Sequence, residues 1–134
     1  MLGVAAPGSS NTRFSVNVAV LGASDDPQKY SYRSVKLLKE KGHTVFPVHP
    51  ALTSIDGLKV YASIKDVLDS VDTVSLYVSK EVSSRLADEI LEKRPKRLIF
   101  NPGAENPELK SKARDRGIQT LEACTLTMLV TNQF

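Results

Sequence analysis

The sequence has no tryptophan and only one cysteine, Cys124. A single cysteine cannot form an intramolecular disulfide, so the chain does not belong to the disulfide-rich class of small secreted domains. We therefore expect a reducing, cytoplasmic location. No apolar run approaches the ~20 residues that a membrane-spanning helix needs, and we expect no membrane partner.

The excess of positive over negative charge is also small. Eighteen Lys and Arg residues face fifteen Asp and Glu residues, for a net charge of +3. This surplus is too small to indicate nucleic-acid binding, although it suits an anionic ligand. The basic run at 93–97 predicts a helix end that complements the helix dipole, followed by a strand. An anion-binding patch or a targeting signal is the alternative.

Patterns that carry catalysis are missing as well. The two histidines and the cysteine lie far apart and have no metal-ligand spacing. There is no Ser-His-Asp or Cys-His set, and no carboxylate lies close enough in sequence to orient His49 as a base. The sequence therefore favours a non-catalytic role, and whether any catalysis occurs stays open.

The composition is that of an ordinary globular domain. The 134 residues are 41% hydrophobic and 25% charged, and this length suits one domain that buries roughly two-thirds of its unfolded surface. Residues 1–13 are rich in Gly, Ala, Ser and Pro. They predict a flexible N-terminal tail, and residues 14–134 form the predicted domain.

Apolar strand patterns alternate with amphipathic helix patterns along the domain. Strands are expected at 16–21, 44–48, 59–61, 73–78, 97–101 and 119–122, and the main helices at 31–41, 80–94 and 107–116. Such alternation predicts an α/β fold, namely a single doubly wound, Rossmann-like parallel sheet of five to six strands. Pro47 and Pro50 predict that the second strand leaves the sheet near its end.

In such a sheet a ligand binds at the carboxyl edge, where the strand order reverses. We place that point near Gly22 and Val78. The turn Gly22-Ala23-Ser24 has only the first glycine of the dinucleotide fingerprint, so it is a weak signal alone. Its small residues still allow phosphate oxygens to approach the backbone, and Lys29 or Arg33 could pair with a phosphate. A plain tight turn with solvated charges is the alternative.

Two later strand ends refine this prediction. The segment at 45–50 has no acidic residue to hold the ribose hydroxyls of NAD. The turn-rich loop at 101–107 lies at the same edge, where loops often contact ligands. Cys124 is either a buried structural cysteine or a thiol that faces the site.

Taken in order, these segments resemble a known family. The motifs are Gly22-Ala23-Ser24 with Lys29-Tyr30-Ser31, then 45–50, then 57–61, then 101–106, and finally Cys124. They resemble the small stand-alone CoA-binding domain proteins, which are similar to the N-terminal domain of the succinyl-CoA ligase alpha subunit. The resemblance covers about residues 14–130.

The resemblance implies a Rossmann-like domain that binds coenzyme A or an acyl-CoA. It nominates the phosphate and adenosine contacts as Gly22, Ala23, Ser24, Lys29, Tyr30, Ser31, Pro47, Val48, His49 and Pro50. Along the pantetheine path it nominates Asn101, Gly103, Ala104 and Cys124. Many relatives carry Asn at the place of His49 and a Trp-x-Gln-x-Gly pattern at 100–103. Ligase activity is not expected from this domain alone, because it lacks the ligase's further domain.

We therefore expect a binding, carrier or regulatory module for CoA. An NAD(P)-binding enzyme or a redox-sensing domain is the alternative. A homodimer is the default expectation for so small a domain.

Overall fold

Five parallel strands form one sheet in the order β2-β1-β5-β6-β7. The computed structural model describes residues 15–134, and the predicted tail at 1–13 lies outside them. The sheet strands are β1 (Asn17–Leu21), β2 (Thr44–Val48), β5 (Thr73–Leu76), β6 (Arg97–Phe100) and β7 (Gln119–Glu122). Two short strands, β3 (Ser54–Ile55) and β4 (Leu58–Lys59), form a separate antiparallel pair. The α/β, Rossmann-like prediction is confirmed.

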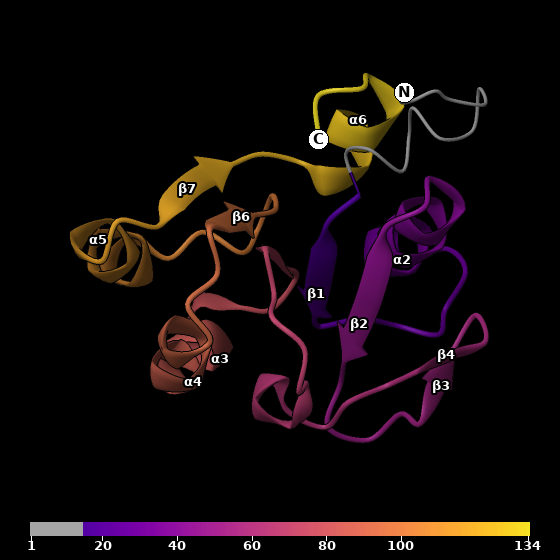
Figure 1. Cartoon of the computed structure of the whole chain (residues 1–134), viewed down its shortest axis with the longest axis horizontal. Helices are drawn as coiled ribbons and strands as arrows, with labels where there is room; N and C mark the ends of the chain where they lie inside the picture. The colour runs from indigo at the N-terminus through magenta and orange to yellow at the C-terminus, as the bar shows by residue number, and fades with distance from the viewer. Residues whose placement is uncertain (1–14) are drawn as a thin grey trace, which may run out of the picture.

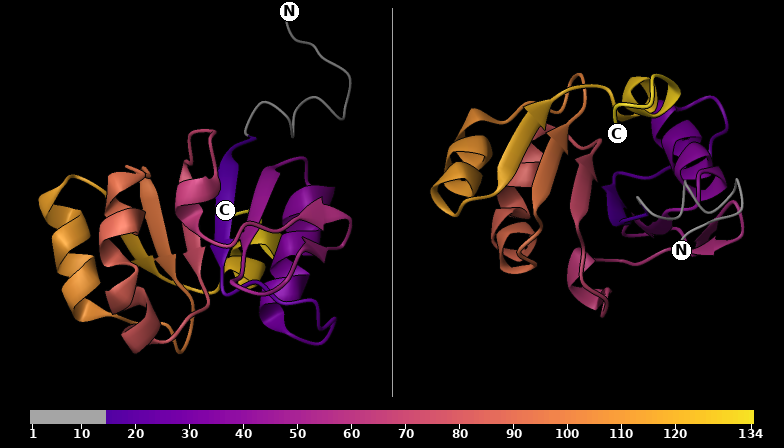
Figure 2. Two further views of the ribbon diagram at one scale, coloured as in Figure 1. Left: turned by 90° about the horizontal axis from the view of Figure 1, so that it is seen from below. Right: turned by 45° about the horizontal axis from the view of Figure 1, so that its top comes forward.

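Helices cover both faces of the sheet (Figure 1). They are α2 (Tyr30–Glu40), α3 (Lys80–Arg85), α4 (Ala87–Glu92), α5 (Pro107–Asp115) and α6 (Thr125–Val130), with a single 3-10 turn, η1 (Ile64–Asp66). The strands run between α2 and α6 on one side and α3, α4 and α5 on the other (Figure 2, right). Among the described residues, no helix combines the length and the apolar content that crossing a membrane requires.

The central strand β1 is buried on both faces, because alternate side chains point to opposite sides of a strand. One core cluster joins β1 to α2 and α6 and includes Val18, Val20, Val35, Leu38 and Leu129. The other joins the same strand to α4 and α5 and includes Ala19, Leu21, Ile90, Leu109 and Ala113. Burying these apolar side chains on both faces holds the β1 end in a fixed position.

Three local predictions need correction. The strand predicted at 59–61 is found at Leu58–Lys59, and it pairs with β3 outside the parallel sheet. Pro47 does not take the chain out of the sheet, because it lies inside β2 and pairs with Val20. This is tolerated because β2 is the edge strand of the sheet, where a missing N–H need not break the ladder. The helix predicted at 80–94 is interrupted at Leu86, whose ψ is 1°. No proline or glycine marks this break, so the sequence pattern could not predict it.

The strand order reverses between β1 and β5. From β1 the chain crosses to β2 on one side, and it later returns to β5 on the other side. The loops that follow β1 and β5 therefore diverge and leave an opening at the carboxyl edge. The predicted switch point near Gly22 and Val78 is confirmed.

Candidate functional site

A cavity of about 840 Å³ opens at this carboxyl edge. Its walls come from the β1–α2 turn, the end of β2, the loop before η1, and the segment from Tyr77 through α4. Its volume lies within the range of natural small-molecule sites, about 300–1,000 Å³.

Gly22 brings the β1–α2 turn against the end of β5. It has φ +82°, and a Cβ atom placed on it would lie 2.7 Å from the Tyr77 carbonyl oxygen and 2.9 Å from Val78 Cγ1. Both the left-handed backbone and the close contact require glycine. This turn therefore sets the width of the cavity at its base.

The first two amides of the turn already have partners. The N–H groups of Gly22 and Ala23 both donate to the Val48 carbonyl, at 3.2 and 3.3 Å. They tie the turn to β2 rather than facing a ligand. The Ser24 hydroxyl oxygen accepts a bond from Asp26 N–H at 3.0 Å, so its own proton is free to donate.

The first turn of α2 supplies the remaining donors. No side chain caps this 11-residue helix, and its first turn contains no acidic residue. The N-terminal amides of a helix and its dipole favour an anion. With Ser24 beside them, these amides are donors suited to an anion, and we call this part of the cavity the anion-binding corner.

Charged side chains of both signs line the cavity. Lys29 and Arg85 are the exposed cations, and Asp25 and Glu89 are the carboxylates. Glu89 accepts a hydrogen bond from the Ser63 hydroxyl at 2.9 Å, which joins α4 to the turn before η1. The anion-binding corner therefore has a lysine at its rim and an arginine on the facing helix.

On the opposite wall, the His49 side chain holds the backbone that follows β2. Its Nδ1 accepts hydrogen bonds from the amides of Ala51 and Leu52, at 3.0 and 3.1 Å. The neutral ring then carries its proton on Nε2. One face of the cavity is thus formed by an oriented imidazole with a donor on its outer nitrogen.

Tyr77 lies where β5 ends and lines the same cavity. Burial raises the pKa of its hydroxyl above the ordinary value, and a hydrogen bond with Ser34 is a smaller opposing influence. The phenol is therefore protonated at neutral pH. It links the cavity floor to α2.

The Asn101 side chain is buried and makes its hydrogen bonds inside the protein. Its amide nitrogen donates to Ser75 Oγ at 3.0 Å and to the Leu76 carbonyl at 2.9 Å, and its oxygen accepts from Thr125 N–H at 2.8 Å. These bonds join β5, β6 and α6. A ligand contact through this side chain would have to break them.

The structure gathers most of the nominated residues around one cavity. Those that line it are Gly22, Ala23, Ser24, Lys29, Tyr30, Ser31, Val48, His49 and Pro50. Pro47 is buried in β2, and outside the lining also lie Asn101, Gly103, Ala104 and Cys124, the last at the N-cap of α6. Ligand contact at all of these positions stays a prediction.

Sequence reasoning missed the wall formed by α3 and α4. The residues that line the cavity there are Val82, Arg85, Leu86 and Glu89. In an unbroken helix their spacing of i, i+3, i+4 and i+7 would place them on one face, although the break at Leu86 divides them between α3 and α4. None of the four was nominated from the sequence, although the charged pair at this spacing was the available signal. Within residues 15–134, no cluster of three or more His, Cys, Asp or Glu side chains is placed to hold a metal ion.

Several curated proteins are similar to this chain in sequence. The alpha subunit of the ADP-forming acetate–CoA ligase II of Pyrococcus furiosus is 36% identical over 84 residues, which are 62% of this chain and 18% of that subunit. An ADP-forming acetate–CoA ligase of Methanocaldococcus jannaschii is 31% identical, over 74% of this chain and 15% of the ligase. The chain thus spans less than a fifth of either ligase. The uncharacterized protein YneT of Bacillus subtilis is closer in size: the match is 27% identical and covers 77% of this chain and 76% of YneT.

Solved structures agree with these matches. An uncharacterized protein superposes with a TM-score of 0.84 at 34% identity, covering 90% of this chain and 98% of that one. A conserved hypothetical protein of Pyrococcus furiosus gives a TM-score of 0.75 at 32% identity, covering 84% and 97%. The model of the CoA binding domain family matches residues 16–130, which contain every sheet strand and every wall of the cavity. The chain therefore belongs to the CoA binding domain family.

Proposed function

We propose that this protein binds coenzyme A or an acyl-CoA in the cavity at the carboxyl edge and acts as a non-catalytic binding, carrier or regulatory module. The observation that carries the proposal is the anion-binding corner within a cavity of about 840 Å³. Family membership supports the identity of the ligand, since the matched model is that of a CoA binding domain.

The cavity matches the chemistry of CoA. The pyrophosphate and the 3′-phosphate carry most of its charge, and charge-assisted hydrogen bonds to phosphate are among the strongest in proteins. The Ser24 hydroxyl, the open first turn of α2 and Lys29 offer such bonds on one wall. Apolar residues on the facing wall, Val78, Val82 and Leu86, offer a surface for the adenine or pantetheine.

The end of β2 argues against NAD as the ligand. Val48 and His49 stand where a dinucleotide site carries the carboxylate that binds the ribose hydroxyls. His49 Nδ1 is already an acceptor for two amides and cannot accept a ribose hydroxyl. NAD is therefore the comparator in the test.

Calorimetric titration with CoA, dephospho-CoA and NAD tests the proposal. We expect saturable, one-to-one CoA binding that weakens about tenfold or more without the 3′-phosphate, because one charge-assisted contact contributes about 1.5–3 kcal/mol. NAD should not saturate. Absent CoA binding together with clear NAD binding would instead support the NAD(P)-binding alternative.

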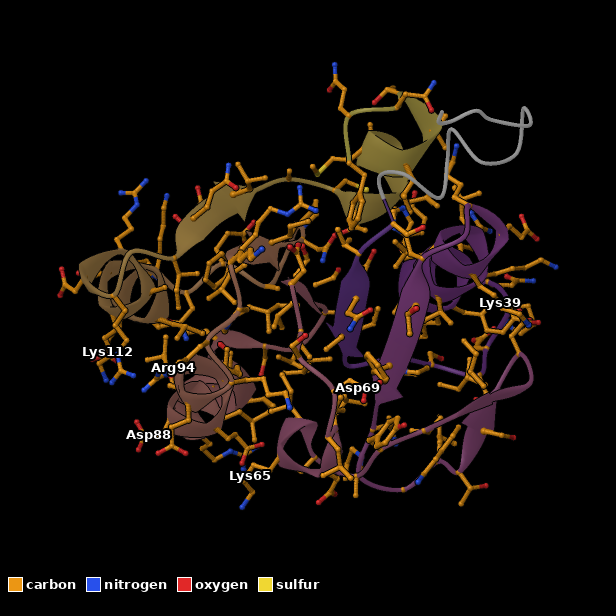
Figure 3. All side chains as sticks on the ribbon, viewed as in Figure 1. Lys39, Lys65, Asp69, Asp88, Arg94 and Lys112 are labelled. Atoms are coloured by element: carbon orange, nitrogen blue, oxygen red, sulfur yellow. The ribbon has the colours of Figure 1, made fainter. Side chains whose placement is uncertain are left out.

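Variants that each remove one charged side chain test whether CoA binds in this cavity. Lys29→Ala and Arg85→Ala should each weaken CoA binding about tenfold, the loss expected for one exposed phosphate contact. Lys112→Ala is the matched control, because Lys112 projects into solvent from α5, away from β1 and β2 (Figure 3). Equal losses in all three variants would indicate only a general charge effect.

The remaining expectations concern the whole protein. A non-catalytic role predicts that bound acyl-CoA is recovered unchanged after incubation, which mass spectrometry would check. The homodimer and the cytoplasmic location stay predictions, and light scattering with and without CoA tests the first of them.

A further inference from the structure

A cavity of about 600 Å³ lies at the amino edge of the sheet, where the chain leaves α4 and α5 and enters the next strands. The residues that line it are Leu91, Arg94, Pro95, Lys96, Arg116, Gly117 and Ile118. They come from the end of α4, its link to β6, and the link from α5 to β7. None of them lines the proposed CoA site. We call this the α4–α5 cavity.

This cavity gives a place to the middle of the basic run at 93–97. The first residue of the run, Lys93, donates to a backbone carbonyl before β5, and the last, Arg97, donates to a threonine of β5. The two middle cations, Arg94 and Lys96, are exposed and line the α4–α5 cavity. The ends of the run therefore hold the fold together, whereas its middle faces open space between α4 and α5 (Figure 3).

Arg116 supplies a third cation from the other segment. It is the exposed C-cap residue of α5, and it lines the same cavity as Arg94 and Lys96. Within residues 15–134, neither of the two ion pairs shorter than 4 Å includes any of these three side chains. Three cations from two segments thus meet at one cavity.

Acidic residues of the adjoining segments lie outside the cavity. Glu92 and Asp115 are exposed near the ends of α4 and α5, and neither is a lining residue. Asp72 lines a neighbouring cavity together with Arg94 and Lys96, and its carboxylate accepts a hydrogen bond from the adjacent threonine hydroxyl. The lining of the α4–α5 cavity therefore contains three cationic residues and no acidic one.

The last turns of α4 and α5 do not need these side chains as hydrogen-bond donors. The Leu91 carbonyl of α4 accepts from Arg94 N–H at 3.0 Å. The Ala113 carbonyl of α5 accepts from the N–H groups of Arg116 and Ile118, each at 3.0 Å. Because backbone groups bind these carbonyls, the cationic side chains remain available to a ligand. Interaction with the helix dipoles is the alternative role, and it predicts no ligand binding.

Arg94 has a backbone conformation that favours glycine. Its φ is +54°, and it directly follows Lys93, the C-cap residue of α4. Helices often have glycine at this place, because a side chain is costly in the left-handed region. The chain thus carries a large cationic side chain where glycine would be easier to accommodate, and such an outlier supports a functional role.

The floor of the cavity is apolar. Leu91, Pro95 and Ile118 line it and are buried. Guanidinium groups bind phosphate oxygens through paired N–H donors, and a lysine adds a point charge. A concave apolar floor with a few charged groups around it is typical of a small-molecule site, and the volume is in the same range.

We propose that the α4–α5 cavity is a second ligand site, which binds a small organic phosphomonoester through Arg94, Lys96 and Arg116. The three cations hold the phosphate, and the apolar floor packs against the organic body. This site is independent of the proposed CoA site, because the two share no lining residue.

Two glycine amides report separately on the two cavities. Gly117 lines the α4–α5 cavity, and Gly22 lines the proposed CoA site. Their resonances in proton–nitrogen NMR spectra of the full chain can be followed in one titration. The probes are phenyl phosphate, benzoate, inorganic phosphate and CoA, all at neutral pH and constant ionic strength.

Phenyl phosphate should shift the Gly117 resonance saturably, with a Kd on the order of 1 mM for a ligand of this size, and leave Gly22 in place. Benzoate carries only one charge and inorganic phosphate has no apolar body, so each should bind at least about fivefold more weakly. A Gly117 resonance that does not respond saturably to phenyl phosphate, or responds equally to all three anions, would overturn the inference.

Variants separate a defined site from the general charge of the protein. Arg116→Gln should weaken phenyl phosphate binding about tenfold, the loss of one charge-assisted contact. Arg94→Lys keeps the charge but removes the paired donors, and it should weaken binding several-fold. Lys36→Gln is the control, because Lys36 is exposed on α2, on the opposite face of the sheet (Figure 2). Equal weakening by Arg116→Gln and Lys36→Gln would contradict a site.

The CoA arm keeps the two proposals apart. CoA at a concentration equal to that of the protein is expected to shift Gly22 and not Gly117. An unchanged Gly22 resonance would contradict the proposed function, while the response of Gly117 to phenyl phosphate tests this inference by itself.

Discussion

At the scale of single residues, the candidate CoA site depends on one glycine. Gly22 allows the β1–α2 turn to touch the backbone of Tyr77, at the point where the strand order reverses. The same contact aligns Ser24 and the start of α2 with the cavity. Glycine is needed here both because the backbone has a positive φ and because a Cβ atom would collide with Tyr77.

Gly22→Ala should destabilise the fold by about 3 kcal/mol or more, because left-handed strain of about 1–2 kcal/mol adds to the cost of overpacking. Gly117→Ala is the control: Gly117 has φ +76° and nothing within 4 Å of an added Cβ. It should lose only about 1–2 kcal/mol of strain energy. Urea unfolding of both variants gives the comparison, and equal losses would show that the contact with Tyr77 is unimportant.

At the scale of elements, caps join the helices to one another. Asn106, which is 1% exposed, accepts a hydrogen bond from Leu109 N–H at the start of α5. Its amide donates to Ser83 Oγ at 2.8 Å and Ser84 Oγ at 3.0 Å in α3. One side chain thus begins a helix and attaches it to the helix that forms a cavity wall.

Asn106→Ala should lower the free energy of unfolding by about 2–4 kcal/mol, since a lost cap adds to buried groups left without a partner. Ser79→Ala removes the exposed cap of α3, where Ser79 Oγ accepts from Val82 N–H. That variant should lose about 1 kcal/mol. Chemical denaturation measures both, and a loss at Asn106 no larger than that at Ser79 would contradict the bridging role.

At the scale of the whole molecule, the sheet separates the proposed CoA site from another cavity. The first lies at the carboxyl ends of the strands, and the other lies beside the amino ends of β1 and β6 and is distinct from the α4–α5 cavity. The core strands between them are nearly fully buried. The two cavities have no lining residue in common, and the one at the amino ends contains His43, whose pKa is shifted.

His43 makes stability depend on pH. Its pKa in the folded state is lowered from 6.5, first by burial and then by the charges of Arg97 and Lys41. The unfolded chain therefore binds a proton more readily. The stability that depends on neutral His43 is fully present above the pKa of this histidine in the unfolded chain. It is lost as the pH decreases through the lower pKa of His43 in the folded protein.

His43→Gln should flatten the fall in stability that begins as the pH decreases through 6.5, the ordinary histidine pKa, because the linked proton uptake is removed. Urea unfolding of the parent and the variant at a series of pH values measures the difference. Parallel loss of stability in both proteins would show that another group is responsible.

Local patterns predicted most elements well. The strands at 44–48 and 119–122 have the predicted bounds, and α5 begins at Pro107, the predicted first residue of that helix. The break at Leu86 was not predictable, because it carries neither of the residues that usually interrupt a helix. The loop at 101–107 was predicted to contact ligand from its turn residues, which cannot reveal that the Asn101 side chain points into the core.

The sequence by itself determined the order of the elements, the parallel sheet and the position of the β1–α2 turn, because apolar periodicity, caps and turn residues act over a few positions. Only the tertiary structure decided that α3 and α4 supply a wall of the first cavity, and that the Gly22 and Ala23 amides bind β2. It alone also brought Arg97 to Phe134, 37 residues away, and to His43. These contacts join segments that are far apart in the sequence, and they form only when the core packs. A pattern that extends over a few neighbouring residues therefore cannot predict them.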